Sequence, residues 1–311
     1  MLFVVNPGDN TFSTFKINET DPTHLIPIGG ATPSGGEFPV AIAYSKKHKT
    51  ACVLNSGGES NFACFSITNH CVTPIPGTTR LLGPNEASPP VAPPGTVSDI
   101  LFNQNENQIL VSIKGGMSSP PGVIATFKIT DDKAFTLATT AVKSTPERGG
   151  LPFGMTLVGK KGNIVLDADP AFGVSVSKIS ESTGLITSSN SLNITGQGVI
   201  CWSSFSPRTG DFYLTDAANG IVTEVAVDSK GPTVRFVGRY NVTGGAGGQI
   251  DQNVGSTKFG DFLYILAPSK GLVNVLKLLG PGKIQGIQSL DMKVPVPDLP
   301  TTLQGMAVYV K

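Results

Sequence analysis

The chain has 311 residues, of which 39% are hydrophobic and 14% are charged, and its formal net charge at pH 7 is +1. A net charge this close to zero creates no broad electrostatic field that would attract nucleic acid or an anionic membrane. The sequence also has no run of about 18 apolar residues, which a membrane span would require. Its 37 glycines and 24 prolines are typical of a chain rich in turns, at a level below that of low-complexity disorder.

The chain begins and ends on apolar, strand-like runs. Leu2–Asn6 matches the second strand of a four-stranded unit and Thr11–Ile17 a third strand, while Gly305–Lys311 matches a first strand. Chain termini usually fray, so apolar ends indicate burial. We expect the two ends to supply strands of one unit and thereby to close a ring.

Between these ends, one pattern recurs without gaps: a short strand, a polar turn, then a β-branched or aromatic strand. It occurs at Val40–Asn55, Ser98–Ile113, Phe153–Ala168, Cys201–Asp216 and Gln252–Ala267. A third strand follows each, then a looser fourth, and the starts are 58, 55, 48 and 51 residues apart. This is the pattern of β-propeller blades. The sequence therefore predicts a single all-β β-propeller domain of six repeats over residues 1–311; a β-sandwich or two smaller β-domains is the alternative.

The four cysteines contain no CxxC pair, which disfavours a zinc ribbon. Cys52 and Cys64 lie on strands flanking the hairpin NSGGES and at matching distances from its centre. We expect them to be cross-strand partners close enough for a disulfide, with Cys64–Cys71 as the alternative pairing. Cys201 is expected to be a small buried apolar residue.

Several sequence blocks resemble one known family. They are LPFGMTL with GNIVLDADPAFG, VICWSSFS with GDFYLTDAANGIVTEVAVD, and TACVLNSGGESNFACFSI. They are similar to the lactonase-type propellers, which include 6-phosphogluconolactonase and the carboxymuconate-cyclising enzymes of fungi, and most to the secreted fungal branch. Family members have seven blades and a longer N-terminus. We therefore expect either that this chain lacks the N-terminal part, leader included, of a family-type ring, which we favour, or that its terminal strand closes a six-bladed ring.

Three Asn-X-Ser/Thr sequons begin at Asn18, Asn193 and Asn241. Together with the resemblance, they favour an extracellular glycoprotein.

Ligands of propellers commonly bind at one mouth of the central channel, where the loops entering the first strands and those leaving the second strands converge. Arg148, in PERGGLPFG, precedes a first strand. A guanidinium there can bind a carboxylate in bidentate fashion, so Arg148 is a candidate catalytic residue for an acidic ligand. The alternative is a solvated arginine paired with Glu147.

Asp167 and Asp216 end second strands, with Asp169 nearby. The three aspartates are a candidate site for a divalent cation such as Ca²⁺, which would polarise a lactone carbonyl and activate water. Asp167 and Asp216 are thereby candidate catalytic residues. The alternative is that they form Asx-turns with their own backbone.

Four further residues at the same strand ends are candidate ligand-binding residues: Asn55, Trp202, Asn219 and Asp251. The histidines, His24, His48 and His70, fall in turns or outer strands, and we expect the turn of His48 to be exposed. No histidine is therefore a candidate for general acid–base catalysis.

The leading hypothesis is a lactonase- or cyclase-like enzyme, hence a hydrolase or an isomerase, that acts on a small oxygenated and acidic ligand. The alternative is a non-catalytic secreted binding or interaction propeller, because fold does not imply function. We expect a monomer with a small-molecule ligand, and with neither nucleic acid nor membrane as a partner.

Overall fold

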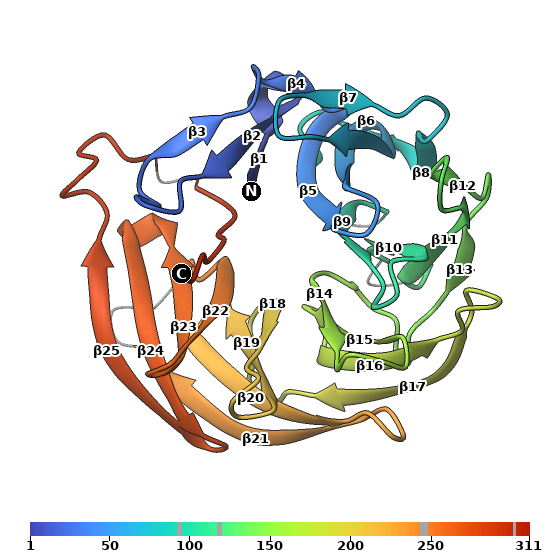
Figure 1. Cartoon of the computed structure of the whole chain (residues 1–311). Coiled ribbons are helices and arrows are strands. Elements are labelled where there is room, and N and C mark those ends of the chain that lie inside the picture. Colours follow the sequence, from blue (N-terminus) through green and yellow to red (C-terminus); the bar gives the residue numbers. More distant parts are fainter. Residues whose placement is uncertain (92–94, 117–119, 243–247, 301–302) are drawn as a thin grey trace. The chain divides into compact units, whose positions relative to one another are not determined.

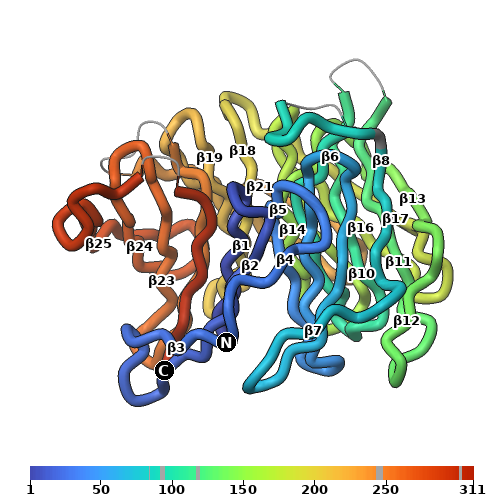
Figure 2. The backbone as a smooth tube through the Cα atoms, turned by 90° about the horizontal axis from the view of Figure 1, so that it is seen from above, coloured from blue at the N-terminus to red at the C-terminus, as the bar shows by residue number. Residues whose placement is uncertain are grey.

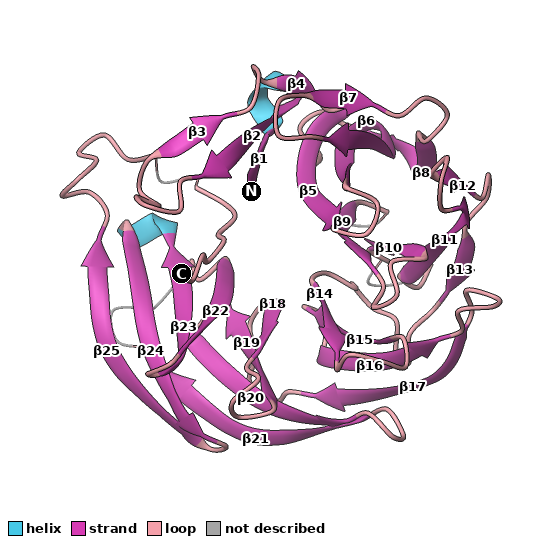
Figure 3. Cartoon of the chain, in the orientation of Figure 1, coloured by secondary structure: helices cyan, strands magenta, loops and turns pink. Residues whose placement is uncertain are grey.

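The computed structural model describes residues 1–91, 95–116, 120–242, 248–300 and 303–311. Their regular structure is almost entirely β (Figure 3), with short 3-10 turns at Pro7–Asp9 (η1) and Pro268–Lys270 (η2). The β-branched and aromatic residues of the predicted strands favour this structure because they pack well on a pleated surface. In the described part of the chain, no helix is long and apolar enough to span a membrane.

The chain divides into two compact units, and the first comprises residues 1–153, 160–163 and 179–187. It contains three antiparallel sheets. The first sheet has β1 (Leu2–Asn6), β2 (Thr11–Ile17), β3 (Leu25–Pro27) and β4 (Thr32–Pro33). The second has β5 (Glu37–Ser45), β6 (Thr50–Ile67), β7 (Val72–Pro74) and β8 (Arg80–Glu86). The third has β9 (Val97–Phe102), β10 (Gln108–Ile113), β11 (Val123–Asp131), β12 (Thr136–Leu137) and β13 (Val142–Ser144).

The second unit comprises residues 154–159, 164–178 and 188–311, and it holds most of three further sheets whose strands follow one another in chain order. The first has β14 (Met155–Val158), β15 (Ile164–Asp169), β16 (Gly173–Ile179) and β17 (Ile186–Asn193). The second has β18 (Ile200–Phe205), β19 (Asp211–Asp216), β20 (Ile221–Asp228) and β21 (Thr233–Asn241). The third has β22 (Asp251–Thr257), β23 (Gly260–Ala267), β24 (Leu272–Gly280) and β25 (Lys283–Asp291). Both Figure 1 and Figure 2 show β23, β24 and β25 side by side.

Alternation along the second strands explains how neighbouring sheets pack within a unit. In β19, Phe212 and Leu214 share an apolar cluster with side chains of β15 and β16, whereas Tyr213 belongs to a cluster with β23. Alternate residues of β6 divide between two clusters in the same way. Because successive strand side chains point to opposite faces, such a strand buries both of its faces.

The six sheets correspond to the six predicted repeats, and they are the blades of a β-propeller. The predicted first strands are found as β5, β9, β14, β18 and β22. The all-β propeller prediction is therefore confirmed.

The strand predicted at Gly305–Lys311 is wrong. Leu2–Asn6 and Thr11–Ile17 pair with each other as β1 and β2, but residues 305–311 form no strand. Instead, the Met306 amide donates a 2.5 Å hydrogen bond to Asp251 Oδ2 at the start of β22, and Val308 lies against Gly255. Side-chain packing and one side-chain acceptor thus hold this segment, in place of a backbone ladder.

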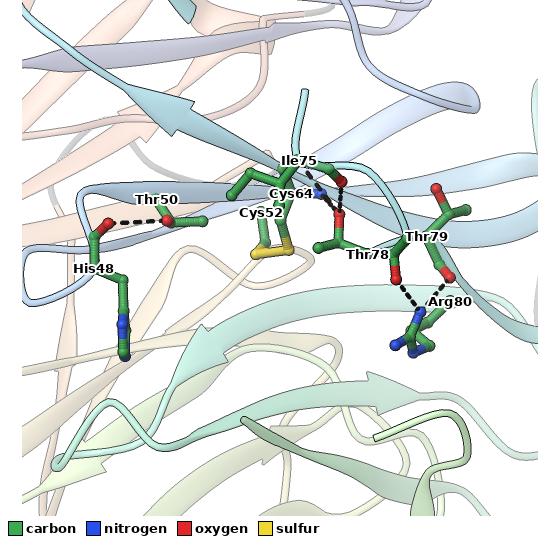
Figure 4. The surroundings of a disulfide bond; sticks show 9 residues. His48, Thr50, Cys52, Cys64, Ile75, Thr78, Thr79 and Arg80 are labelled. Carbon is green, nitrogen blue, oxygen red and sulfur yellow. Dashed lines mark hydrogen bonds between the residues drawn. A yellow bond between two sulfur atoms is a disulfide. The ribbon is translucent and has the colours of Figure 1, made fainter. Parts of the chain in front are cut away.

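The predicted disulfide is confirmed within β6 (Figure 4). The Cα atoms of Cys52 and Cys64 are 4.0 Å apart although 12 positions separate them, so β6 folds back on itself. Gly58 lies midway, with a φ of +54° that glycine adopts without strain. Thr78 Oγ1 accepts a bond from the Cys64 amide (3.2 Å). Cys71, the alternative partner, is free and exposed.

Two local expectations are wrong. His48 lies in the turn between β5 and β6, but only 3% of its side chain is exposed. Its ring packs on Phe135 with 5.1 Å between centroids, and its Nε2 lies 2.7 Å from the Glu106 carbonyl oxygen. The neighbouring sheet thus covers the His48 side chain, although Lys46, Lys47 and Lys49 of the same turn are exposed. Cys201 is only half-buried.

Candidate functional site

Asp216 organises the loops around the end of β19. Its carboxylate accepts backbone hydrogen bonds from Gly198 (2.7 Å) and Val199 (2.9 Å), and from Ala218 (3.0 Å) and Asn219 (3.2 Å). Burial raises the pKa of Asp216, but the four backbone donors outweigh it and the net pKa is lowered. A carboxylate with several backbone donors stays ionised and fixes its loop.

Asn219 lies beside Asp216, as the sequence predicts. Its Nδ2 donates to Asp216 Oδ2 (3.2 Å) and to the Gly196 carbonyl (3.3 Å). The pair forms the Asx-type turn that was the alternative to a ligand site. Its hydrogen-bonding capacity is largely committed to the fold.

Asp167 and Asp169 lie on one face of β15, and each is only 1% exposed. Asp169 Oδ1 accepts a bond from the Ala171 amide (2.9 Å). Among the described residues, no three His, Cys, Asp or Glu side chains gather closely enough to hold a metal ion. At least two of the carboxylates of Asp167, Asp169 and Asp216 serve the turns of their own sheets, and a cation site formed by the three stays a prediction.

The two candidates in the first unit have different settings. Asn55 is fully buried, and its Nδ2 donates to the Ser34 carbonyl (3.3 Å) and to Asn61 Oδ1 (3.1 Å). Arg148 is exposed at a turn that the Gly149 amide closes onto the Pro146 carbonyl (2.9 Å), with a φ of +65°. Its role as a carboxylate anchor stays a prediction.

In the second unit, hydrogen bonds and packing tie together the starts of the first strands β14, β18 and β22. The Gly154 amide donates to the Cys201 carbonyl (3.0 Å). A Cβ at Gly154 would lie 2.4 Å from the Trp202 ring, so the indole packs directly on this backbone. Gln252 Nε2 donates to the Trp202 carbonyl (3.3 Å) and to the Tyr213 carbonyl.

Asp251 begins β22 at this junction. Its Oδ1 accepts the Gln252 amide (2.6 Å) and its Oδ2 accepts the Met306 amide. Burial raises the pKa of Asp251 to about 6, although both backbone donors act in the opposite direction. A carboxyl group with such a pKa exchanges its proton near neutral pH, as a general base must.

Gln249, two residues before Asp251, was missed by sequence reasoning. It is fully buried, yet neither its amide nitrogen nor its amide oxygen has a hydrogen-bond partner in the described chain. The adjoining backbone is fixed, since the Gly248 amide donates to the Ala217 carbonyl (2.7 Å) and the Ile250 amide to the Leu266 carbonyl (3.2 Å). A buried amide without partners is costly, so this side chain is suited to a polar ligand atom or water.

We call the group Trp202, Gln249, Asp251 and Gln252 the inner-strand site. Its members are linked by their positions between residues 249 and 252 and by the bond from Gln252 to the Trp202 carbonyl; they include an acid with a raised pKa, an unpaired amide and an indole. A surface pocket of about 350 Å³ lies elsewhere in this unit, at the β20–β21 hairpin, and is lined by Ala226, Val227, Asp228, Thr233 and Arg235. None of the predicted site residues lines that pocket.

No protein-family model and no curated protein sequence matches the chain. Solved structures do. A proposed 6-phosphogluconolactonase from Bacteroides uniformis is 13% identical with a TM-score of 0.70, over 93% of this chain and 82% of that one. A second, from Bacteroides fragilis, is 13% identical with a TM-score of 0.52, over 90% of each chain.

A β-propeller domain of the protein Cps50 (Swd1) is 10% identical with a TM-score of 0.56, over 93% of this chain and 85% of that one. At these identities, likeness shows the fold alone. The chain thus has the fold of the lactonase-type β-propellers, which confirms the resemblance at that level.

Proposed function

We propose that this propeller is a lactonase-like hydrolase for a small oxygenated, acidic ligand, with Asp251 as its general base. The observation that carries the proposal is the setting of Asp251, whose pKa is raised to about 6 two residues from the buried, unpaired amide of Gln249. Perturbed acids beside unsatisfied polar groups are more frequent at functional sites than elsewhere. The structural likeness to proposed 6-phosphogluconolactonases agrees with this class of reaction.

The chemistry of lactone hydrolysis assigns a task to each group. Ionised Asp251 takes a proton from water as the water oxygen bonds to the lactone carbonyl carbon. The Gln249 amide N–H donates to the oxyanion that forms. When the ring C–O bond breaks, the proton held by Asp251 passes to the leaving alkoxide, which yields the hydroxy acid and regenerates the base. The Trp202 indole provides an apolar wall for the ligand.

The two backbone bonds to Asp251 do not block this role. Each carboxylate oxygen accepts one backbone N–H, and a carboxylate has about four acceptor positions. The bonds fix the orientation of the carboxylate and leave lone pairs for water.

The test is acid release in a pH-stat with a panel of sugar and dicarboxylic lactones, with Ca²⁺ and with chelator. We expect hydrolysis whose rate rises as pH passes about 6, and about a hundredfold loss of kcat in Gln249→Met. Asp251→Asn should abolish turnover. The matched control is Asp211→Asn, which changes another partly desolvated acid of this unit with a pKa of about 6 that lies outside the inner-strand site.

Three outcomes would overturn the proposal. Full activity in Asp251→Asn would remove the base, and loss of activity with chelator would assign water activation to a metal instead. If no lactone of the panel is hydrolysed, the non-catalytic binding propeller or a cyclising isomerase is favoured over the lactonase.

We further propose an extracellular location. The Cys52–Cys64 disulfide supports it, because such bonds persist mainly in oxidising compartments. The test counts the thiols of the unfolded protein before and after reduction. Two thiols before reduction and four after it would agree with the proposal, whereas four before reduction would contradict it.

A further inference from the structure

The three sequons have different settings in the folded chain. Asn193 ends β17, and the next residue, Ile194, is 3% exposed with its amide bonded to the Phe172 carbonyl (2.9 Å). The Thr195 carbonyl of the same sequon accepts a bond from Arg239 (2.7 Å). This sequon cannot leave the sheet without breaking these contacts.

The second sequon is held in a similar way. Asn241 ends β21, and Val242 is 6% exposed with its amide bonded to the Gly220 carbonyl (3.1 Å). Thr243 lies outside the described residues. Extraction of this sequon would expose a buried valine and break a backbone hydrogen bond.

The Asn18 sequon lies instead in the loop that joins β2 to β3. Glu19, Thr20 and Asp21 are exposed. Asn18 Oδ1 accepts bonds from the Thr20 amide (3.0 Å), from Thr20 Oγ1 (2.7 Å) and from the Asp21 amide (3.4 Å). The sequon is thus a local turn in water whose only hydrogen bonds, among those described for the Asn18 side chain, are within the turn itself.

We propose that Asn18 is an N-glycosylation site of the folded protein. In the reaction, Asn18 Nδ2 forms a bond to the anomeric carbon of a lipid-pyrophosphate-linked oligosaccharide. The bond from that carbon to the pyrophosphate oxygen breaks, the lipid pyrophosphate leaves, and the amide nitrogen loses one proton to a base of the transferase. The donors on Oδ1 support this step, because they stabilise negative charge on the amide oxygen as the proton leaves.

Asn193 and Asn241 are exposed and Asn18 is half-buried, but local release of the segment from the fold favours Asn18. A transferase must enclose the asparagine and the hydroxyl residue two positions later, so the segment has to leave the protein surface. The loop of Asn18 can do so locally, whereas the other sequons require partial opening of β17 or β21, which lowers the population of the reactive form. The Cys52–Cys64 disulfide independently supports a compartment in which such transferases work, and the inference does not depend on the lactonase proposal.

The experiment compares the folded, disulfide-intact chain with the reduced and unfolded chain. Both are incubated with a purified single-subunit oligosaccharyltransferase and a lipid-linked oligosaccharide, and occupancy of each sequon is followed by peptide mass spectrometry. In the folded chain we expect Asn18 to react at least about tenfold faster than Asn193 and Asn241, and in the unfolded chain all three to react at similar rates.

The controls are Thr20→Ala, which should abolish modification of Asn18, and Thr20→Ser, which should retain it. The proposal is overturned if Asn18 stays unmodified in the folded chain while the unfolded chain reacts. It is equally overturned if Asn193 or Asn241 reacts as fast as Asn18 in the folded chain.

Discussion

The free energy of unfolding of the wild-type protein should fall as pH rises, and replacement of Asp211 by asparagine should remove part of that fall. Asp211 on β19 pairs with Ala226, while Tyr213 pairs with Glu224, so Asp211 and Glu224 are diagonal neighbours on one face of the sheet. Glu224 is fully buried. Its carboxylate accepts bonds from the hydroxyls of Tyr213 (3.0 Å) and Tyr240 (2.5 Å), and from the Gly282 amide (3.1 Å).

Burial and the neighbouring Glu224 carboxylate favour the protonated form of Asp211, so we place the proton of this pair on Asp211. Burial, the hydrogen bond to Glu224 and the repulsion from its charge together raise the pKa of Asp211 to about 6, against the opposing effect of Arg235. Between its ordinary pKa of 3.8 and about 6, folded Asp211 holds a proton that the unfolded chain has released. The stabilisation is therefore fully present below pH 3.8 and is lost as pH rises through about 6.

The magnitude follows from the two pKa values. A gap from 3.8 to about 6, at about 1.36 kcal/mol for each pH unit, corresponds to a loss of at most about 3 kcal/mol in the free energy of unfolding. Asp251, with a pKa also raised to about 6, contributes a loss of the same sign. The informative quantity is thus the difference between wild type and Asp211→Asn, because Asp251 is common to both.

The assay is urea denaturation from about pH 4 to about pH 7.5 at constant ionic strength. Relative to wild type, Asp211→Asn should become more stable by up to about 3 kcal/mol across this range. Asp228→Asn, an exposed acid of the same sheet, is the control and should run parallel to wild type. A difference between wild type and Asp211→Asn that does not change with pH would refute the assignment of the proton to Asp211.

Three further predictions concern single sites. Cys52→Ser should lower the free energy of unfolding by about 2–3 kcal/mol, because the disulfide closes a short loop of the unfolded chain; equal urea midpoints with and without reductant in wild type would contradict this. Arg148→Ala should abolish binding of acidic ligands, measured by calorimetry, with little change in Tm because Arg148 is exposed; retained binding would show that Arg148 does not anchor the ligand carboxylate. Asp216→Ala should lower the free energy of unfolding by about 2–4 kcal/mol, because several backbone N–H groups lose their acceptor. Since its folded pKa is lowered, the stabilisation by Asp216 is present above pH 3.8 and should fade on acidification, and denaturation of both proteins near about pH 3 and pH 6 checks this.

Much of the fold follows from local sequence patterns. The repeated strand, polar turn and β-branched strand predicted the six sheets, because alternation along a strand requires no knowledge of distant residues. The Cys52–Cys64 pairing followed from symmetry about one hairpin for the same reason. Gly305–Lys311 has a strand-like pattern too, but its packing on Gly255 and the bond of Met306 to Asp251 depend on a strand some 50 residues earlier.

The candidate site shows the limit of such reasoning. An aspartate at a strand end can cap a turn or bind a ligand, and the difference for Asp216 lies in backbone donors from two separate segments. Asp251 was recognised by position only; its raised pKa comes from burial in the folded chain, against which the backbone donors of Gln252 and Met306 act. Gln249 carries no motif at all. The sequence by itself determined the strands of the blades and the disulfide, since these depend on neighbours along the chain. Only the tertiary structure decided which polar groups form hydrogen bonds within the fold and which are left to bind a ligand. The reason is that burial and hydrogen bonding depend on residues that are distant in sequence and close in space.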